Sequence, residues 1–148
     1  MTLLADNRIA RHRYFVTDTF EAGISLKGTE VKSAKAGRIQ LRDSFVRIMR
    51  GEAWLLNCHI APYDQGNIMN HEPTRTRKLL MHKAEIKRLI GQGEQKGMTL
   101  VPLKMYLKRG LVKVEFGLCK GKELHDKRET MKKRDSQREI ARALRGRE

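Results

Sequence analysis

The feature that most constrains the fold of this chain is a series of short apolar runs, rich in β-branched and aromatic residues, with turn-forming residues between them. Branched and aromatic side chains favour extended strands, and the small polar residues between the runs favour reversal of the chain. The runs are Tyr14–Val16, Phe45–Met49, Ala53–Ile60, Thr99–Leu107 and Leu111–Leu118. Residues 1–119 are therefore predicted to be mainly β-structure.

Two of the turns predict hairpins. Arg50-Gly51 follows the run Phe45–Met49, and Lys108–Gly110 precedes the run Leu111–Leu118. A short turn that contains glycine, placed between two strand-like runs, is a strong local sign of an antiparallel pair. We therefore expect both pairs of runs to lie next to each other in one sheet.

Two helices are predicted between the strands. Ile86 and Ile90 share one face of a helix expected at about residues 83–90, and Gly91 stands where that helix should end. A second, weaker helical pattern covers Thr29–Ala36. Short strands at hairpin spacing with helices inserted are typical of a small closed antiparallel β-barrel of the OB type with two or three helices. A split sandwich would fit the same pattern.

The charge of the chain limits the class of partner. Lys and Arg number 32 against 17 Asp and Glu, which gives a net charge of +15. The basic residues are spread over the whole chain instead of along one face of one helix, so nucleic acid is favoured over a membrane surface. No apolar run is long enough to span a bilayer, and Met1–Ala10 lacks the apolar stretch of a signal peptide. A cytoplasmic protein without a membrane partner is expected.

The composition changes in the last segment, residues 120–148. This segment has eleven basic and six acidic side chains and few apolar ones. Burial of these few apolar side chains would not offset the conformational entropy that the segment loses when it becomes ordered. The segment is therefore expected to be disordered when free. Glu, Lys, Arg and Ala dominate it, which favours a helix once RNA is bound. The predicted organisation is a barrel at residues 1–119 and a basic tail at residues 120–148.

The sequence offers little catalytic chemistry. Its five histidines are scattered, and Cys58 and Cys119 do not have the spacing of zinc ligands. No glycine-rich phosphate loop is present in the sequence. We expect no metal, no cofactor and no enzymatic activity, with both cysteines as reduced thiols in the core. The alternatives are a general ribosomal or RNA-chaperone binding module and a metal-free ribonuclease with two histidines as acid and base.

Two basic stretches are candidates for contact with RNA phosphates. The first lies directly before Tyr14 and Phe15, and cations beside aromatic rings are typical of RNA-binding surfaces. The second follows Pro73 and includes arginines whose guanidinium groups suit phosphate oxygens. The residues of the two stretches are Arg8, Arg11, His12, Arg75, Arg77 and Lys78.

Motifs along nearly the whole chain occur together, and in the same order, in one known family. They are Asn7–Phe15, Phe20–Ile24, Gly28–Ser33, Arg77–Leu80, Val101–Leu103, Lys120–Lys122 and Asp126–Arg128. In these motifs the chain resembles the SmpB family, the SsrA-binding proteins that partner tmRNA. The resemblance implies an OB-type barrel with a basic tail, no catalytic activity, and an adapter that delivers tmRNA to stalled ribosomes for trans-translation, peptide tagging and ribosome rescue.

The resemblance also implies site residues. It places Asn7, Glu21 and Leu80 at the surface that binds the tRNA-like domain of tmRNA, and Lys32, in the motif Gly28–Ser33, is expected to bind RNA as well. A carboxylate on such a surface would accept hydrogen bonds from base amino groups. The tail is implied to occupy the empty mRNA path and decoding region of the ribosome, and elongation factor Tu to join the delivery complex. The tail residues expected to make these contacts are Lys122, His125, Asp126, Lys127, Arg128, Lys132, Lys133 and Arg134.

Overall fold

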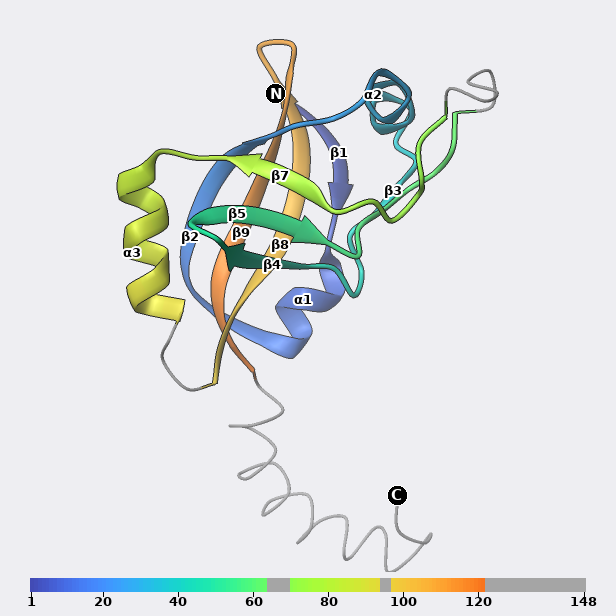
Figure 1. The fold of residues 1–148 in the computed structure, drawn as a ribbon. Helices are drawn as coiled ribbons and strands as arrows, with labels where there is room; N and C mark the ends of the chain where they lie inside the picture. Colours follow the sequence, from blue (N-terminus) through green and yellow to red (C-terminus); the bar gives the residue numbers. More distant parts are fainter. Residues whose placement is uncertain (64–69, 94–96, 122–148) are drawn as a thin grey trace, which may run out of the picture.

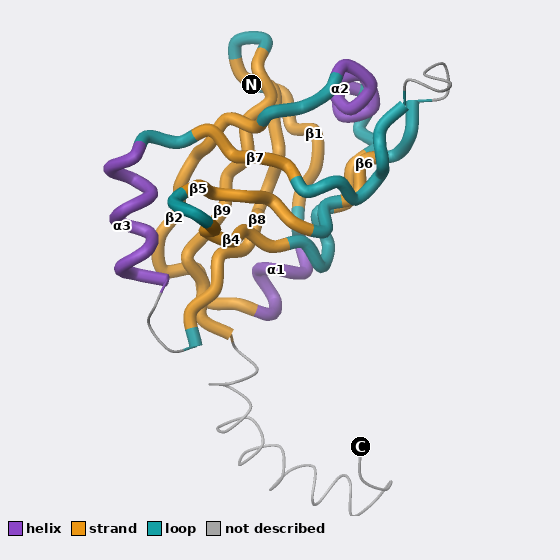
Figure 2. Tube along the Cα trace, in the orientation of Figure 1, coloured by secondary structure: helices purple, strands orange, loops and turns teal. Residues whose placement is uncertain are grey.

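The computed structural model describes residues 1–63, 70–93 and 97–121, and over these residues the fold is mainly β with three helices (Figures 1 and 2). The strands are β1 (Thr2–Asp6), β2 (Tyr14–Ile24), β3 (Ile39–Gln40), β4 (Phe45–Met49), β5 (Glu52–Leu56), β6 (His59–Ile60), β7 (Arg77–Leu80), β8 (Met98–Lys108) and β9 (Leu111–Gly121). The helices are α1 (Arg8–Arg13), α2 (Gly28–Lys35) and α3 (Lys83–Gly93). The predicted tail lies outside the described residues, apart from Lys120 and Gly121, which belong to β9.

The main sheet closes on itself. Its strand order is β1-β8-β4-β5-β7-β2-β9, and β9 also pairs with β8, so the ring returns to its second strand. One edge of β8 pairs with β9 along the strand, and the other edge pairs first with β4 and then with β1. All of these pairs are antiparallel, which confirms the predicted closed antiparallel barrel. Strands β3 and β6 form a small separate pair.

Both predicted hairpins are confirmed. Strands β4 and β5 pair around Arg50 and Gly51, whose φ angles are 54° and 73°. Strands β8 and β9 pair around Arg109 and Gly110, whose φ angles are 52° and 77°. Two successive residues with positive φ define the tight turn whose twist matches that of the strands, and glycine lowers its steric cost.

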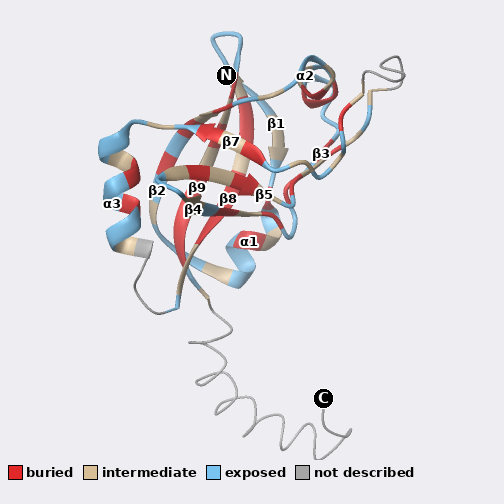
Figure 3. Cartoon of the chain, in the orientation of Figure 1, coloured by how far each residue is buried: buried red, intermediate tan, exposed pale blue. Residues whose placement is uncertain are grey.

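The two predicted helices are present, with one boundary corrected. Helix α2 lies within a residue of the prediction, whereas α3 continues past Gly91 to Gly93. Gly91 does not have the positive φ of a helix-ending glycine, so the helix continues through it. Ile86 and Leu89 are buried on the inner side of the helix. Ile90 is 38% exposed, so the buried stripe is narrower than predicted. Figure 3 shows this division along α3.

Several elements were not predicted. Residues 8–13 form α1 instead of leading directly into a strand, because Ala10 packs against Val101, Leu103 and Cys119. The predicted run Ala53–Ile60 is two strands, since Asn57 between them has φ 61°. Strand β2 extends far beyond its predicted end, and β1, β3 and β7 have no strong local pattern of their own.

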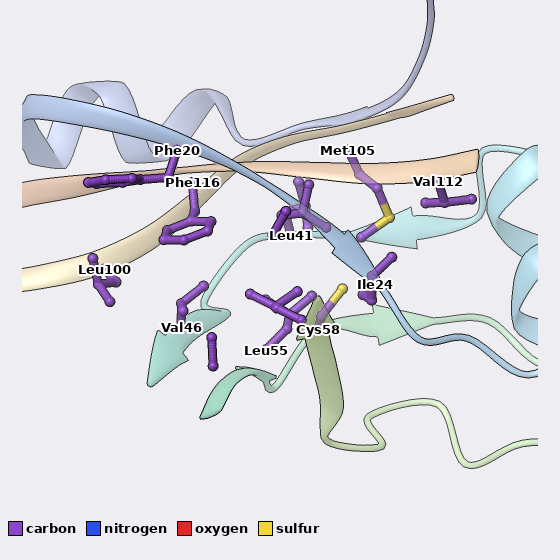
Figure 4. Close-up of a cluster of buried hydrophobic side chains, with 14 of the residues drawn as sticks. Phe20, Ile24, Leu41, Val46, Leu55, Cys58, Leu100, Met105, Val112 and Phe116 are labelled. Carbon is purple, nitrogen blue, oxygen red and sulfur yellow. The ribbon is translucent and has the colours of Figure 1, made fainter. Parts of the chain in front are cut away.

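The core fills the barrel. Apolar side chains from β2, β4, β5, β8 and β9 meet in its interior, and Figure 4 shows the rings of Phe20 and Phe116 among them, stacked with centroids 5.6 Å apart. Cys58 and Cys119 are fully buried free thiols, as expected. Burial raises the pKa of Cys58 to about 12 and that of Cys119 to about 11, so both stay protonated at neutral pH.

No helix in the described part of the chain has both the length and the apolar character needed to span a lipid bilayer.

Candidate nucleic-acid interface

A shallow groove of about 680 Å³ lies on the outside of the barrel, between β2, β7 and the start of α3. We call it the β2–β7 groove. Its lining includes three of the predicted RNA-binding residues, Glu21, Lys78 and Leu80. The antiparallel pairing of β2 with β7, in which Gly23 lies opposite Leu80, brings these residues together from distant parts of the sequence.

Strand alternation decides which side chains face the groove. In β2, Phe20, Ala22 and Ile24 point into the core, so Glu21 and Gly23 between them face outward. In β7 the same alternation buries Leu79 and leaves Leu80 on the surface, where it is 53% exposed. The sequence left open whether Leu80 faces the core or a ligand, and the structure places it on the surface.

Gly23 allows the two strands to approach at the floor of the groove. A Cβ atom at Gly23 would lie 3.3 Å from the Cβ of Leu80, which is closer than ordinary van der Waals contact. It would also lie 3.7 Å from the Nζ atom of Lys113. A side chain at position 23 would therefore require Leu80 to shift, whereas Lys113 lies at ordinary contact distance.

Glu21 is held by two neighbours on β8. The Tyr106 hydroxyl donates a hydrogen bond to Oε2 of Glu21, and the Nζ atom of Lys108 lies 3.5 Å from both carboxylate oxygens. The hydrogen bond from Tyr106 lowers the pKa of Glu21, assisted by the charges of Lys108 and Lys113 and opposed by partial burial. The carboxylate is therefore ionised at neutral pH and acts only as an acceptor.

The groove also contains cations that were not predicted as site residues. Lys113 of β9 and Lys83 of α3 both line it. In β9, Val112 and Val114 are buried on either side of Lys113, so the alternation of this run already pointed Lys113 outward. Lys78 lies 3.4 Å from the carboxylate of Glu52, and both side chains remain partly exposed.

The predicted cations of the first basic stretch lie on α1, away from the groove. Arg8, Arg11 and His12 are exposed, and Arg11 pairs with Asp6 at 3.0 Å. Helix α1 precedes the start of β2, whereas Glu21 lies seven residues into that strand, a distance of about 23 Å at about 3.3 Å per residue. The two sets of residues therefore form separate surfaces of one barrel (Figure 1).

The aromatic residues behind this stretch divide between core and surface. Tyr14 is half-buried and packs against the small cluster that includes Ala10 and Leu103. Phe15 is 41% exposed and lies opposite Lys120 in the pairing of β2 with β9. Of the two rings, Phe15 is therefore the one on the surface.

Asn7 was expected at an RNA surface, but its side chain is buried. Only 6% of the residue is exposed, and its amide group donates to the carbonyl oxygens of Pro102 at 2.8 Å and Leu41 at 3.3 Å. Its backbone N–H donates to the carbonyl of Leu103 at 2.8 Å. The bonds to Pro102 and Leu103 connect the start of α1 to β8 at the point where the β8–β9 register shifts, between Pro102 and Lys104. In this structure Asn7 therefore supports the fold instead of presenting its amide to a ligand.

Arg77 is likewise buried instead of facing RNA. Its guanidinium and the Glu30 carboxylate are both 0% exposed, and Nε of Arg77 lies 2.6 Å from Oε2 of Glu30. The other nitrogens donate to the carbonyls of Cys58 at 2.7 Å and Pro73 at 3.0 Å. The Arg77 guanidinium therefore bonds inside the protein and is not part of the candidate interface.

Arg75 completes this buried ion pair, and we call Glu30, Arg75 and Arg77 the Glu30 cluster. Arg75 Nη2 lies 2.6 Å from Oε1 of Glu30, while its side chain is 30% exposed. Burial opposes ionisation of Glu30, but hydrogen bonds from Arg75, the backbone N–H of Lys27 and Arg77 lower its pKa to about 2. Lys32 on the same helix is exposed, and its Nζ lies 5.2 Å from the centre of the Tyr63 ring.

The histidines of the described residues lie on different elements. His71 is buried, with its ring nitrogens 2.8 Å from the Thr29 hydroxyl and 2.9 Å from the Ile60 carbonyl oxygen. His12 and His59 belong to α1 and β6, and His82 lines the β2–β7 groove just before α3. Within the described part of the chain, no three His, Cys, Asp or Glu residues are grouped as metal ligands would be.

The fold and the groove together define a class of protein: a small, strongly basic β-barrel whose outer face presents cations, an exposed leucine and an oriented carboxylate. Cations suit phosphates, an exposed apolar side chain suits a base or ribose, and a carboxylate suits base N–H donors. This combination is typical of a barrel that binds structured RNA.

Comparison with known proteins identifies the family. The model of the family described as "SmpB protein" matches residues 4–146. The SsrA-binding protein of Carboxydothermus hydrogenoformans is 61% identical over 98% of this chain and 97% of its own length. That of Halalkalibacterium halodurans is 58% identical over 96% of this chain and 92% of its own. The chain belongs to the SmpB family, as its motifs indicated.

A solved structure agrees. A chain from the structure described as "tmRNA-SmpB: a journey to the center of the bacterial ribosome" matches with a TM-score of 0.68 and 55% identity. The match covers 80% of this chain and 83% of that one. The same family is thus reached from sequence and from three-dimensional structure.

Proposed function

We propose that this protein is an RNA-binding adapter that binds the tRNA-like domain of tmRNA and delivers it to stalled ribosomes for trans-translation, peptide tagging and ribosome rescue. The observation that carries the proposal is the β2–β7 groove, where Glu21, Lys78 and Leu80 meet on one outer face. The names of the relatives, SsrA-binding proteins, and the tmRNA–SmpB structure support the choice of RNA.

In this proposal the groove makes the specific contacts. Lys78 and Lys113 neutralise phosphates, Leu80 packs on a base or ribose, and Glu21 accepts hydrogen bonds from base N–H groups. The exposed cations Arg8 and Arg11 of α1 form a second phosphate-binding surface. Lys32, exposed on α2, contributes through its charge, and so does the partly exposed Arg75, because the single carboxylate of Glu30 cannot neutralise both Arg75 and Arg77.

The predicted tail, residues 120–148, performs the second half of the function. We propose that its cations occupy the vacant mRNA path while His125 stacks on a base near the decoding region. The triple variant Asp126→Ala, Lys127→Ala and Arg128→Ala should bind tmRNA as the parent does and fail to support tagging. The division would be contradicted if the triple variant bound tmRNA more weakly but the tmRNA that it did bind still supported tagging.

The protein acts as an adapter without chemistry of its own in this proposal, and elongation factor Tu joins the delivery complex. Bacterial ribosomes work in the cytoplasm, so a cytoplasmic location follows. The two rival functions predict different results: a ribonuclease would cleave the RNA it binds, and a general RNA chaperone would bind unrelated structured RNAs equally well.

The test compares two RNAs of equal length across a salt series: the tRNA-like domain of tmRNA and an unrelated structured RNA. We expect the full chain to prefer the tRNA-like domain by at least about tenfold, with a preference that persists as salt weakens both affinities. Equal affinities at every salt concentration would reject the adapter function, and RNA cleavage during the assay would indicate the ribonuclease.

A further inference from the structure

The Glu21 carboxylate sits in a fixed setting although it faces solvent. Tyr106, which donates to Oε2 of Glu21, is only 3% exposed, and its ring is covered by Lys104, whose Nζ lies 5.8 Å from the ring centre. Lys108 lies 3.5 Å from both oxygens of the same carboxylate. A glutamate on an open sheet surface would ordinarily sample several rotamers, so these two neighbours restrict it.

We propose that Tyr106 and Lys108 are positioning residues that hold the Glu21 carboxylate oriented and charged, ready to accept hydrogen bonds from the N–H donors of an unpaired RNA base. The proposal rests on the proposed function and assigns roles to residues that lie beside the groove. It predicts that neither residue acts on RNA independently of Glu21.

The geometry leaves the carboxylate with acceptor capacity to spare. Each of its oxygens accepts more than one hydrogen bond; Tyr106 occupies one site on Oε2, and Lys108 shares one long contact, 3.5 Å, between the two oxygens. Glu21 is exposed and lines the β2–β7 groove, so the remaining sites are accessible to a ligand in that groove. A base with amino or imino N–H groups on its free pairing edge provides the matching donors.

The protonation states agree with these roles. Burial and the hydrogen bond to Glu21 raise the pKa of Tyr106, so its hydroxyl keeps its proton and remains a donor. The charges that face Glu21 are Lys108 of β8 and, from β9, Lys113 and the carboxylate of Glu115 opposite it. The cations also offset the repulsion that an isolated carboxylate would exert on RNA phosphates.

Preorganisation explains why such a setting is useful. A side chain that is already ordered loses less entropy when the ligand arrives, and an acceptor that is already charged needs no proton release. Removing the Tyr106 hydroxyl or the Lys108 charge should therefore weaken RNA binding even though neither group has to touch the RNA.

The first experiment is a set of double-mutant cycles on the full chain, with the tRNA-like domain of tmRNA as the probe. Tyr106→Phe and Lys108→Met should each lower affinity by about fivefold, the size of one lost hydrogen bond or charged contact. Neither change should lower affinity further once Glu21→Gln is present. The arginine variant Lys108→Arg should retain most of the affinity.

Lys104 offers a matched control. It also projects from β8 beside the Tyr106 ring, but its ion pair, at 3.9 Å, is with Glu115 instead of Glu21. Lys104→Met removes the same charge as Lys108→Met and should lower affinity by less than about twofold. If the two lysine variants lost affinity equally, Lys108 would act only as a general cation and the proposal would be overturned.

A second measurement reads the positioning directly in the free protein. The pKa of Glu21, followed by NMR of its side-chain carboxyl carbon, should rise toward the ordinary value of 4.5 in Tyr106→Phe and change little in Lys104→Met. An unchanged Glu21 pKa, or Tyr106→Phe losses that persist in the Glu21→Gln background, would reject the positioning role.

The proposed function fails separately. If the parent protein did not prefer the tRNA-like domain, the adapter function would be rejected whatever the variants did. If the parent preferred it and Glu21→Gln weakened binding, while Tyr106→Phe and Lys108→Met bound as the parent does, only the positioning role would be rejected.

Discussion

Arg77 and Lys78 are neighbours in β7, yet their charged groups lie in opposite surroundings. The Arg77 guanidinium is fully buried against Glu30, whereas the Lys78 ammonium lines the outer groove. The Glu30 cluster and the β2–β7 groove thus use the same residue types, carboxylates and cations, in different ways. In the cluster the buried charges of Glu30 and Arg77 are satisfied by the protein itself, and in the groove the charges remain accessible to a ligand.

The comparison shows that burial, and not sequence position, separates a structural cation from a binding cation. A buried ion pair tolerates no loss of a partner, because the remaining charge would be unpaired away from water. An exposed cation contributes little to stability and is available to phosphates. Variants in the two regions should therefore affect different measurements.

The largest effect is expected from Arg77→Met. This change leaves the Glu30 carboxylate with Arg75 as its only ion-pair partner in the cluster and should lower the free energy of unfolding by about 3–5 kcal/mol. Urea denaturation measures the loss. Lys78→Met, one residue away, is the control and should change stability by no more than about 0.5 kcal/mol. Equal stabilities for the two variants would remove the distinction between the regions.

Acid should destabilise the parent protein through Glu30. The folded pKa of about 2 lies below the ordinary value of 4.5, so this group stabilises the fold above about pH 4.5, and the contribution disappears as pH falls toward 2. The contribution is on the order of 3 kcal/mol. Denaturant titrations at several pH values should show this slope in the parent and a shallower one in Glu30→Gln. A variant with an undiminished slope would assign the acid sensitivity to other carboxylates.

Leu80→Ala should affect binding and spare stability. Leu80 is 53% exposed, so its truncation should change the free energy of unfolding by less than about 0.5 kcal/mol. The lost apolar contact should lower affinity for the tRNA-like domain by about five- to tenfold. Leu111, 61% exposed at the β8–β9 turn, gives the control variant Leu111→Ala, which should bind normally. Equal losses would place the interface outside the groove.

The smallest effect is expected from Lys78→Ala. Loss of one phosphate contact should weaken binding to all RNAs by a few-fold and reduce the slope of affinity against salt by roughly one unit. Binding titrations over a salt series measure both. A loss confined to one RNA would instead make Lys78 a base-reading residue.

Much of the architecture could be predicted from local pattern. The hairpins at Arg50-Gly51 and Arg109-Gly110 depend on residues close in sequence, and so does α2. Strand β7 could not be predicted in this way, because one of its two inward-facing residues, Arg77, is charged, and only the other, Leu79, is apolar. Glu30, which is 47 residues away in the chain, and the carbonyls of Cys58 and Pro73 together make an inward arginine stable there.

The candidate site was predictable in part. The motifs indicated Glu21, Lys78 and Leu80, and the structure brings these three into one groove. Asn7 and Arg77 came from the same kind of reasoning, but their side chains are buried. The sequence pattern did not distinguish these two groups, since an Asn amide can bond backbone carbonyls and an Arg can pair with a buried carboxylate as well as either can bind RNA.

The sequence by itself determined the β-rich composition of the barrel, its hairpin turns, the excess of positive charge and the family. These properties depend on residue type and on short-range spacing, and both can be read from the amino-acid sequence. The tertiary structure decided which charges are satisfied internally and which remain accessible, and it brought Tyr106 and Lys108 to Glu21. Those outcomes depend on strand register and ring closure between distant segments, where a shift of one residue would exchange the inward and outward faces.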